Sequence, residues 1–385
     1  MSPAGDDITG SFAAALADAR DALVDLRKPP HDLDSQMVNS RRLMRWLHDR
    51  SWTTRGWPTS AGGTGGSSAD RGRIYDRLVA DGYSIPDHLF VLEVVGPAVV
   101  NHAPELARRF LPRALTGEEL WSQGFSEPEA GSDLASLRTR AVESEGGYVI
   151  NGQKVWTSYG ARADKIVLLA RTGTTESRHR GLTMFLVDLD QVGVERRPIA
   201  LASGREELAE IFFTDVRVDS DRIIGEVGGG WAVAMDLLQY ERGIYAWMRM
   251  ATTTAHLRQI VRRSSKEQGA SPTADRVVGR AYLHLAALRA RTFSTLGKLA
   301  RGETAGPETS IDKVLLATAE QSVLDAAREL IGAQFVIGDD PEDVHWREEW
   351  WYSRAASVYG GAGEIQRTII ADRLLGLPKE HDNGR

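Results

Sequence analysis

Apolar residues follow two different periods along the chain, and the change of period divides it into segments. Between Ser11 and Arg27 they recur at steps of three and four, which is typical of one helical face. The residues of this face are Phe12, Leu16, Ala19, Leu23 and Leu26. The first third of the chain is therefore predicted to be helical. A Gly-rich stretch at residues 57–67 has no strand before it and no P-loop lysine, so we interpret it as a structural loop.

Near Leu120 the pattern becomes that of short β-strands. Tyr148-Val149-Ile150 and Gln153-Lys154-Val155-Trp156 flank Asn151-Gly152, a dipeptide that is the strongest short signal for a hairpin turn. Further β-rich runs, separated by polar turns, follow at residues 166–170, 183–187 and 211–213. These short strands predict a small barrel or sandwich.

After Gly228-Gly229-Gly230 the pattern is helical again. Long helices are predicted over residues 231–266, 274–301 and 310–331 and from Val344 onward, which favours an antiparallel bundle. The predicted fold class is α+β multidomain. We place a helical domain at residues 1–119, a β-domain at 120–228 and a helical bundle at 229–385.

Composition and charge narrow the classes of function. The 385 residues are 42% hydrophobic and 26% charged, with a formal net charge of −6, which argues against nucleic-acid or anionic-membrane binding. Without cysteine there is no disulfide framework, thiolate nucleophile or cysteine-ligated metal, and the histidines lack zinc-binding spacing. The N-terminal residues do not resemble a signal peptide, and no apolar run approaches the ~20 residues of a membrane span. We expect a cytoplasmic protein without a metal site.

The segment from Gln123 to Asp133 carries the first candidate chemistry. Gly131 allows a ligand to approach the backbone, while Ser126 and Ser132 supply short hydroxyls and Pro128 stiffens the loop. Such a loop can hold the diphosphate or polar ring edge of a cofactor. The alternative from these residues alone is a polar connection between strands.

Three separated segments carry a family resemblance when they are taken together. They are residues 125–133, residues 151–158 and residues 359–378. Shorter matches are Arg55-Gly56-Trp57-Pro58, Gly229-Gly230-Trp231 and Leu374-Leu375-Gly376-Leu377-Pro378. In this order the segments closely resemble the signatures of the FAD-dependent acyl-CoA dehydrogenases, over nearly the whole chain.

The resemblance implies a helical N-terminal domain, a central β-domain and a C-terminal four-helix bundle, with FAD between the last two. By position, the residues implied for FAD are Gln123, Phe125, Ser126, Gly131, Ser132, Trp156, Thr157, Ser158, Ala362 and Glu364. Arg276 is a further candidate, although the Arg-x-x-Phe-Gly pattern of the family is absent around it. The residues implied for substrate are Ser132, Arg242, Gly360 and Gly361.

One position departs from the best-known family pattern. Where many members read Tyr-Glu-Gly and use that glutamate to remove the substrate's α-proton, this chain reads Tyr359-Gly360-Gly361. Branches acting on long or branched acyl chains instead place the acid in the first bundle helix, immediately before an arginine. Glu241, followed by Arg242, matches that position and is our candidate base. Without the family context, the two would be read as a solvated helical pair.

Gly360 has two possible uses of its own. Its backbone N–H would be free to stabilise charge on a thioester carbonyl, and its missing side chain leaves room for a branched or bulky acyl group. The expected reaction converts an acyl-CoA, or an acyl-carrier-protein thioester, to the trans-2-enoyl product. An electron-transferring flavoprotein is the expected electron acceptor, and a homodimer, homotetramer or mixed tetramer the expected assembly.

Several alternatives stay open. A flavin-dependent oxidase or monooxygenase would share the fold, and a non-catalytic partner subunit would keep it for assembly. Ser310-Ile311-Asp312-Lys313 matches the Ser-x-x-Lys pattern of some acylating enzymes but has no partner motifs, so we interpret it as a helix start. The aromatic run at residues 345–352 is expected to pack a bundle.

Overall fold

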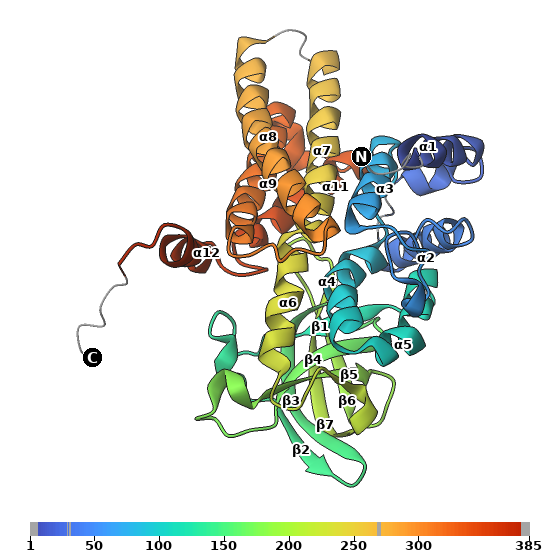
Figure 1. Cartoon of the computed structure of the whole chain (residues 1–385). Helices are drawn as coiled ribbons and strands as arrows, with labels where there is room; N and C mark the ends of the chain where they lie inside the picture. Colours follow the sequence, from blue (N-terminus) through green and yellow to red (C-terminus); the bar gives the residue numbers. More distant parts are fainter. Residues whose placement is uncertain (1–6, 29, 31, 268–270, 379–385) are drawn as a thin grey trace. The chain divides into compact units, whose positions relative to one another are not determined.

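The computed structural model describes residues 7–28, 30, 32–267 and 271–378. Their contacts divide the chain into two compact units, Met1–Tyr240 and Glu241–Arg385. Figure 1 shows helices first, then a sheet, then helices along the chain. This order confirms the predicted α+β fold class. The three-domain division at residues 119 and 228 stays a prediction.

The N-terminal part of the first unit is helical. Its helices are α1 (Ile8–Asp18), α2 (Leu33–His48), α3 (Ser68–Ala80), α4 (Asp87–His102) and α5 (Pro104–Thr116). The predicted apolar face is buried at Phe12, Leu16, Leu23 and Leu26, but the first helix ends at Asp18 and a 3₁₀ turn follows at Val24–Arg27. The helical spacing of the apolar residues therefore predicted the buried face correctly, but the predicted helix was longer than the observed one.

The segment between α2 and α3 is held by a buried charge. Arg71 on α3 donates to Oε1 of Glu93 on α4 at 2.7 Å and to the carbonyl of Gly56, and its guanidinium lies 4.4 Å from the Trp57 ring centroid. Both side chains of the ion pair are almost fully buried. The Arg55-Gly56-Trp57-Pro58 motif is thus a packed structural element of this unit.

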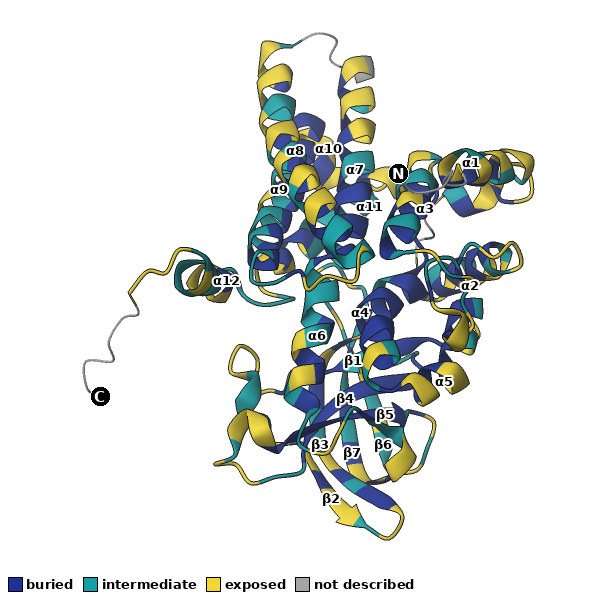
Figure 2. Cartoon of the chain, viewed as in Figure 1, coloured by how far each residue is buried: buried dark blue, intermediate teal, exposed yellow. Residues whose placement is uncertain are grey.

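A single sheet follows. Its strands are β1 (Trp121–Gly124), β2 (Arg140–Ser144), β3 (Gly147–Ser158), β4 (Lys165–Arg171), β5 (Leu182–Asp188), β6 (Val194–Ile199), β7 (Leu208–Asp219) and β8 (Ile223–Ile224). The strand order is β6-β7-β3-β2-β4-β5-β8, and β1 pairs in parallel with β4. Figure 2 shows β4 and β5 buried along their lengths, and Leu33 and Met37 of α2 belong to the same apolar core.

The predicted hairpin at Asn151-Gly152 is wrong. These residues lie inside β3, where the register against β7 shifts at a β-bulge between Ile150 and Gly152. Asn151 exchanges hydrogen bonds with Asp215 on β7, at 3.0 and 2.9 Å. The hairpin turn comes earlier, at Gly146 (φ +77°), between β2 and β3. The glycine signal therefore marked a bulge, which shares the need for an unusual backbone conformation.

The second unit is helical, apart from its connecting turns. It contains α7 (Ile244–Glu267), α8 (Pro272–Ala300), α9 (Thr309–Ile331), α10 (Ala333–Ile337), α11 (Pro341–Arg354) and α12 (Gly363–Ile369). Helix α9 packs against α7, α8, α11 and α12. The last two residues of α6 (Gly230–Arg242) also belong to this unit. The predicted helix from 231 to 266 is in fact broken at buried Gly243, since glycine is a weak helix former.

Candidate active site

Residues predicted for the cofactor gather at one end of β1 and β3. The hydroxyl of Ser122 donates to the carbonyl of Ser158, and the backbone N–H of Val155 donates to the carbonyl of Ser126 at 3.0 Å. These bonds bring the segment containing Gln123, Phe125 and Ser126 beside the segment containing Trp156, Thr157 and Ser158. Two of the separated sequence motifs thus form one edge of the first unit.

A buried lysine holds this edge together. Lys154 Nζ donates to the carbonyl of Phe125 at 3.0 Å and to Oε1 of Glu127 at 2.8 Å. Glu127 also accepts from the backbone N–H groups of Arg138 and Thr139, at 2.6 and 2.9 Å. Burial lowers the pKa of Lys154 to about 8. Burial alone would raise the pKa of Glu127, but Lys154 and the amide donors lower it.

A second bulge turns Trp156 outward. The register of β3 against β7 shifts again between Lys154 and Thr157, and Trp156 has a φ of +62°, a strained conformation for a bulky residue. Its indole is 58% exposed. Next to it, the hydroxyl of Thr157 is buried and has no hydrogen-bond partner among the described residues. A large aromatic face and an unpaired hydroxyl are groups that a flat polar ligand can use.

The turn that follows β1 is open. Glu127 and Ala130 pair across it, while Gly131 and Ser132 are exposed and no atom lies within 4 Å of a Cβ placed on Gly131. Asp133 is tied by Arg178, whose Nη2 donates to Oδ1 at 2.9 Å. Backbone and hydroxyl groups of this turn are therefore accessible to a ligand.

The acid candidate and the glycine-rich segment lie together in the second unit. A Cβ placed on Gly360 would lie 2.6 Å from Oε1 of Glu241 and 3.1 Å from Cε of Lys313. Gly360 has a φ of +64°, in the left-handed region that favours glycine. Gly360, which lacks the acid of the common family pattern, therefore lies next to Glu241, the candidate acid of this chain.

Arg242 lies on the other side of the same segment. Its Nη2 would be 3.6 Å from a Cβ on Gly361, and its Nε is buried without a hydrogen-bond partner among the described residues. Burial lowers the pKa of Arg242, although the charge of Glu241 opposes this. Among the described residues, none accepts a hydrogen bond from the backbone N–H of Gly360. Donors are thus available beside Glu241.

A buried polar network fixes the residue before Gly360. The Tyr359 hydroxyl donates to Oε2 of Glu320 on α9 at 3.2 Å, and Glu320 also pairs with Arg249 on α7. Burial raises the pKa of the Tyr359 phenol, so that its proton is kept for this bond. Sequence reasoning missed Glu320 and Arg249, because each falls within an ordinary helical pattern. It named Lys313 only as part of a Ser-x-x-Lys match, and only the fold brings Lys313 beside Gly360.

The remaining candidates are dispersed. Ala362 precedes α12 and Glu364 is exposed in its first turn, while Arg276 is exposed near the start of α8. The aromatic run at residues 345–352 lies on α11, where Trp346 is buried and stacks edge-on against His256. That run packs the bundle, as expected.

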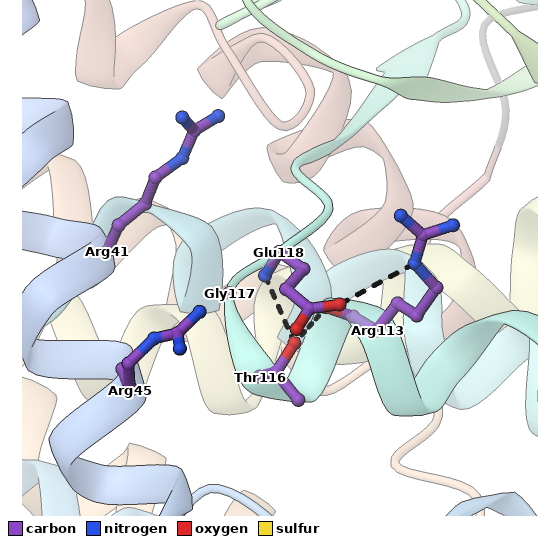
Figure 3. A pocket seen from close by; sticks show the side chains of 6 residues that line it. All are labelled: Arg41, Arg45, Arg113, Thr116, Gly117 and Glu118. Atoms are coloured by element: carbon purple, nitrogen blue, oxygen red, sulfur yellow. Dashed lines mark hydrogen bonds and ion pairs between the residues drawn. The ribbon is translucent and has the colours of Figure 1, made fainter.

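A separate hollow of about 390 Å³ lies between α2 and the end of α5. Figure 3 shows Arg45 extending from α2 toward Thr116 and Glu118, while Arg41, one turn earlier on α2, points away from Glu118. Glu118 pairs with Arg113 at 3.7 Å. None of the residues predicted for the cofactor or the substrate lines this hollow. It therefore has no part in the site described above.

Comparisons with known proteins agree with the fold and these motifs. Family models described as the middle and C-terminal domains of acyl-CoA dehydrogenase match residues 122–216 and 228–375. Acyl-CoA dehydrogenase IpdE1 of Mycobacterium tuberculosis (strain ATCC 25618 / H37Rv) is 39% identical over 331 residues, covering 85% of both chains. IpdE1 of Mycolicibacterium smegmatis (strain ATCC 700084 / mc(2)155) is 36% identical over 391 residues, covering 97% of this chain and 95% of that protein.

A solved structure shows the same likeness. A variant of the Tcur3481-Tcur3483 steroid ACAD matches with a TM-score of 0.83 and 25% identity, covering 95% of this chain and 100% of that chain. The fold and the site thus define a flavoprotein oxidoreductase. The chain belongs to the acyl-CoA dehydrogenase family, whose members depend on FAD.

The residues present fit FAD. Exposed Trp156 and the unpaired Thr157 hydroxyl suit a flat ring with polar edges, and the open turn at Gly131 and Ser132 suits a diphosphate. Among the described residues, no helix combines the length and apolar character needed to cross a membrane.

Proposed function

We propose that this acyl-CoA dehydrogenase removes the α-proton of an acyl thioester with Glu241 and forms the trans-2-enoyl product. The adjacency of Glu241 and Gly360 is the observation that carries this proposal, because the candidate acid lies where the family's other acid would project. FAD, when bound, supplies the acceptor for the hydride that leaves Cβ. The chain's own residues bind the thioester, orient it and take the proton.

The proton step needs a carboxylate that is ionised before the reaction and accepts a proton during it. Glu241 acts on two neighbouring cations, since its charge opposes the lowering of the pKa of Lys313 and of Arg242 by burial. The backbone N–H of Gly360 is proposed to donate to the thioester carbonyl, stabilising the charge that develops as the α-proton leaves. Arg242 and Gly361 are proposed to contact the substrate, and Ser132 to contact both substrate and cofactor.

The proposed cofactor residues are the set that the family resemblance implies. They are Gln123, Phe125, Ser126, Gly131, Ser132, Trp156, Thr157, Ser158, Arg276, Ala362 and Glu364. Arg276 carries the least support, since its sequence context departs from the family pattern and its side chain is exposed.

A branched or bulky acyl chain is the proposed substrate class. The support for this class is the solved relative described as a steroid ACAD, which is named for a bulky ring system. The space directly beside Gly360 is taken by Glu241 and Lys313. The electron-transferring flavoprotein as acceptor, the homo-oligomeric assembly and the cytoplasmic location are proposed on the sequence and the family resemblance. The same resemblance leaves the thioester carrier as CoA or an acyl carrier protein.

Anaerobic stopped-flow tests the base. Purified protein is mixed with straight, branched and steroid-like acyl-CoAs, and flavin bleaching identifies the best substrate. Glu241→Gln should keep FAD and bind that substrate but reduce flavin about two to four orders of magnitude more slowly. Exposed Glu329→Gln on α9 is the matched control. Normal reduction by Glu241→Gln would show that the base lies elsewhere.

The same preparation separates the alternative functions. A dehydrogenase bleached by substrate should reoxidise slowly when air is admitted, whereas an oxidase or monooxygenase should reoxidise rapidly. A non-catalytic partner subunit should purify without flavin colour, or carry flavin that no acyl-CoA bleaches.

A further inference from the structure

Lys313 is a buried cation that the reaction described so far does not use. It lies one turn into α9 with only 4% of its surface exposed. Its Nζ donates to the carbonyl of Ala356, in the 3₁₀ turn Ala355–Ser357 that leads to Gly360. The same atom lies 4.3 Å from the ring centroid of Tyr359. One side chain therefore contacts two successive parts of the segment that ends at Gly360.

Lys313 and Glu241 approach the same small volume. The position of a Cβ at Gly360 is 3.1 Å from Cε of Lys313 and 2.6 Å from Oε1 of Glu241. The stem of Lys313 and the carboxylate of Glu241 thus both lie next to the position that a side chain of residue 360 would occupy. The charge of Glu241 favours the ionised form of Lys313, as expected for opposite charges inside a protein.

The groups that act on Lys313 are of both signs. Glu241 favours its charge, whereas Arg242 at the end of α6 and Arg249 on α7 oppose it. Burial is the largest influence and, with these arginines, lowers the pKa of Lys313 to about 8. Arg249 is itself paired with Glu320. At neutral pH Lys313 is therefore mostly charged, and Glu241 is the carboxylate that opposes this lowering.

We propose that Lys313 is a positioning residue for the dehydrogenation. Its ammonium holds the turn at Ala356, which sets the backbone of Gly360, and keeps Glu241 ionised and ready to accept the substrate's proton. Lys313 itself neither gives nor takes a proton in the step. This role rests on the proposed function of Glu241 as base.

The test is the pH profile of anaerobic flavin reduction, measured with the best acyl-CoA of the panel. Lys313→Met removes the charge at similar length, and Lys313→Arg keeps it. In Lys313→Met, the acid limb should move up by about one pH unit or more, because Glu241 loses its neighbouring cation. At pH values where Glu241 is ionised in the wild type but protonated in Lys313→Met, flavin reduction should be about tenfold slower in the variant. Lys313→Arg should restore the acid limb, and Lys298→Met, which breaks a half-exposed pair with Glu308, should leave it unchanged.

Two further measurements keep the outcomes distinct. The first is made on Glu241→Gln and on the double variant Glu241→Gln/Lys313→Met. For each protein, the FAD content and the affinity for the saturated acyl-CoA report binding separately from turnover. In the Glu241→Gln background, Lys313→Met should slow the residual reduction by less than it does in the wild type, since only its effect through the backbone of Gly360 remains. An unshifted acid limb in FAD-loaded Lys313→Met, or an equal loss in both backgrounds, would overturn the role of Lys313 alone. Normal reduction by Glu241→Gln would instead overturn the proposed base. If Lys313→Met does not fold, Lys313→Gln replaces it with the same expectations.

Discussion

The carboxylate of Glu241 occupies the space in which a side chain of Gly360 would begin. Its Oε1 lies 2.6 Å from the position of a Cβ at residue 360, closer than two non-bonded heavy atoms of this kind can approach. Residue 360 also has a φ of +64°. A side chain at this position would therefore have to displace the Glu241 carboxylate, and the backbone conformation favours glycine.

Gly360→Ala should destabilise the second unit and slow flavin reduction. The positive φ costs about 1–3 kcal/mol for a residue with a Cβ, and the new methyl group displaces Glu241. Thermal unfolding and anaerobic stopped-flow measure the two effects. Gly279→Ala on α8 is the control, because no atom lies within 4 Å of its Cβ position and alanine favours a helix by about 0.5–1 kcal/mol. Equal melting temperatures for the two variants would contradict the expectation.

Lys154→Met should weaken FAD retention. The substitution leaves Glu127 buried without its cation and frees the Phe125 carbonyl, which should cost about 3–5 kcal/mol in the free energy of unfolding. Release of flavin during denaturation, followed by its fluorescence, measures this loss. Arg73→Met, which removes an exposed partner of Asp70, should change the free energy of unfolding by no more than about 1 kcal/mol. If Lys154→Met retained FAD as well as the wild type, the Lys154–Glu127 pair would not be what holds the predicted cofactor residues at the ends of β1 and β3 together.

The contribution of Glu127 to stability should disappear in acid. Its pKa in the folded protein is below the ordinary value of 4.5, so the ionised form stabilises the fold fully above that value. The contribution is lost as the pH falls through the lower folded-state pKa. The destabilisation caused by Glu127→Gln should therefore be constant between about pH 7 and 5.5 and shrink below pH 4.5. Denaturant titrations of both proteins across this range provide the measurement, and a pH-independent difference would be the contrary result.

Periodicity in the sequence predicted the order of helical and β regions, because burial of one face leaves a repeating pattern. It failed where one glycine admits several conformations. Gly152 was predicted to lie in a turn and instead lies at a bulge. The apolar pattern predicted one helix through Gly243, but the helix is interrupted there. The turn at Gly146 carries the same type of signal as Gly152, so sequence alone did not separate them.

Only the parts of the candidate site that lie in recognisable sequence motifs could be predicted. The sequence paired Gly360 with Glu241 through the family resemblance, and the fold brings the two together. Lys313 drew notice only as part of a Ser-x-x-Lys match, whose chemistry it does not share. Its position beside Gly360 depends on how α9 packs, which no local pattern reports.

The crowding at residue 360 also bears on how enzymes of this family diverge. In a chain that already carries Glu241, a glutamate gained at position 360 would have to displace the Glu241 carboxylate. Losing Glu241 first would leave a chain with neither acid. Under the proposed role of Glu241, each single-step intermediate would be impaired, and the location of the acid would be inherited stably within a lineage while the surrounding acyl pocket varies.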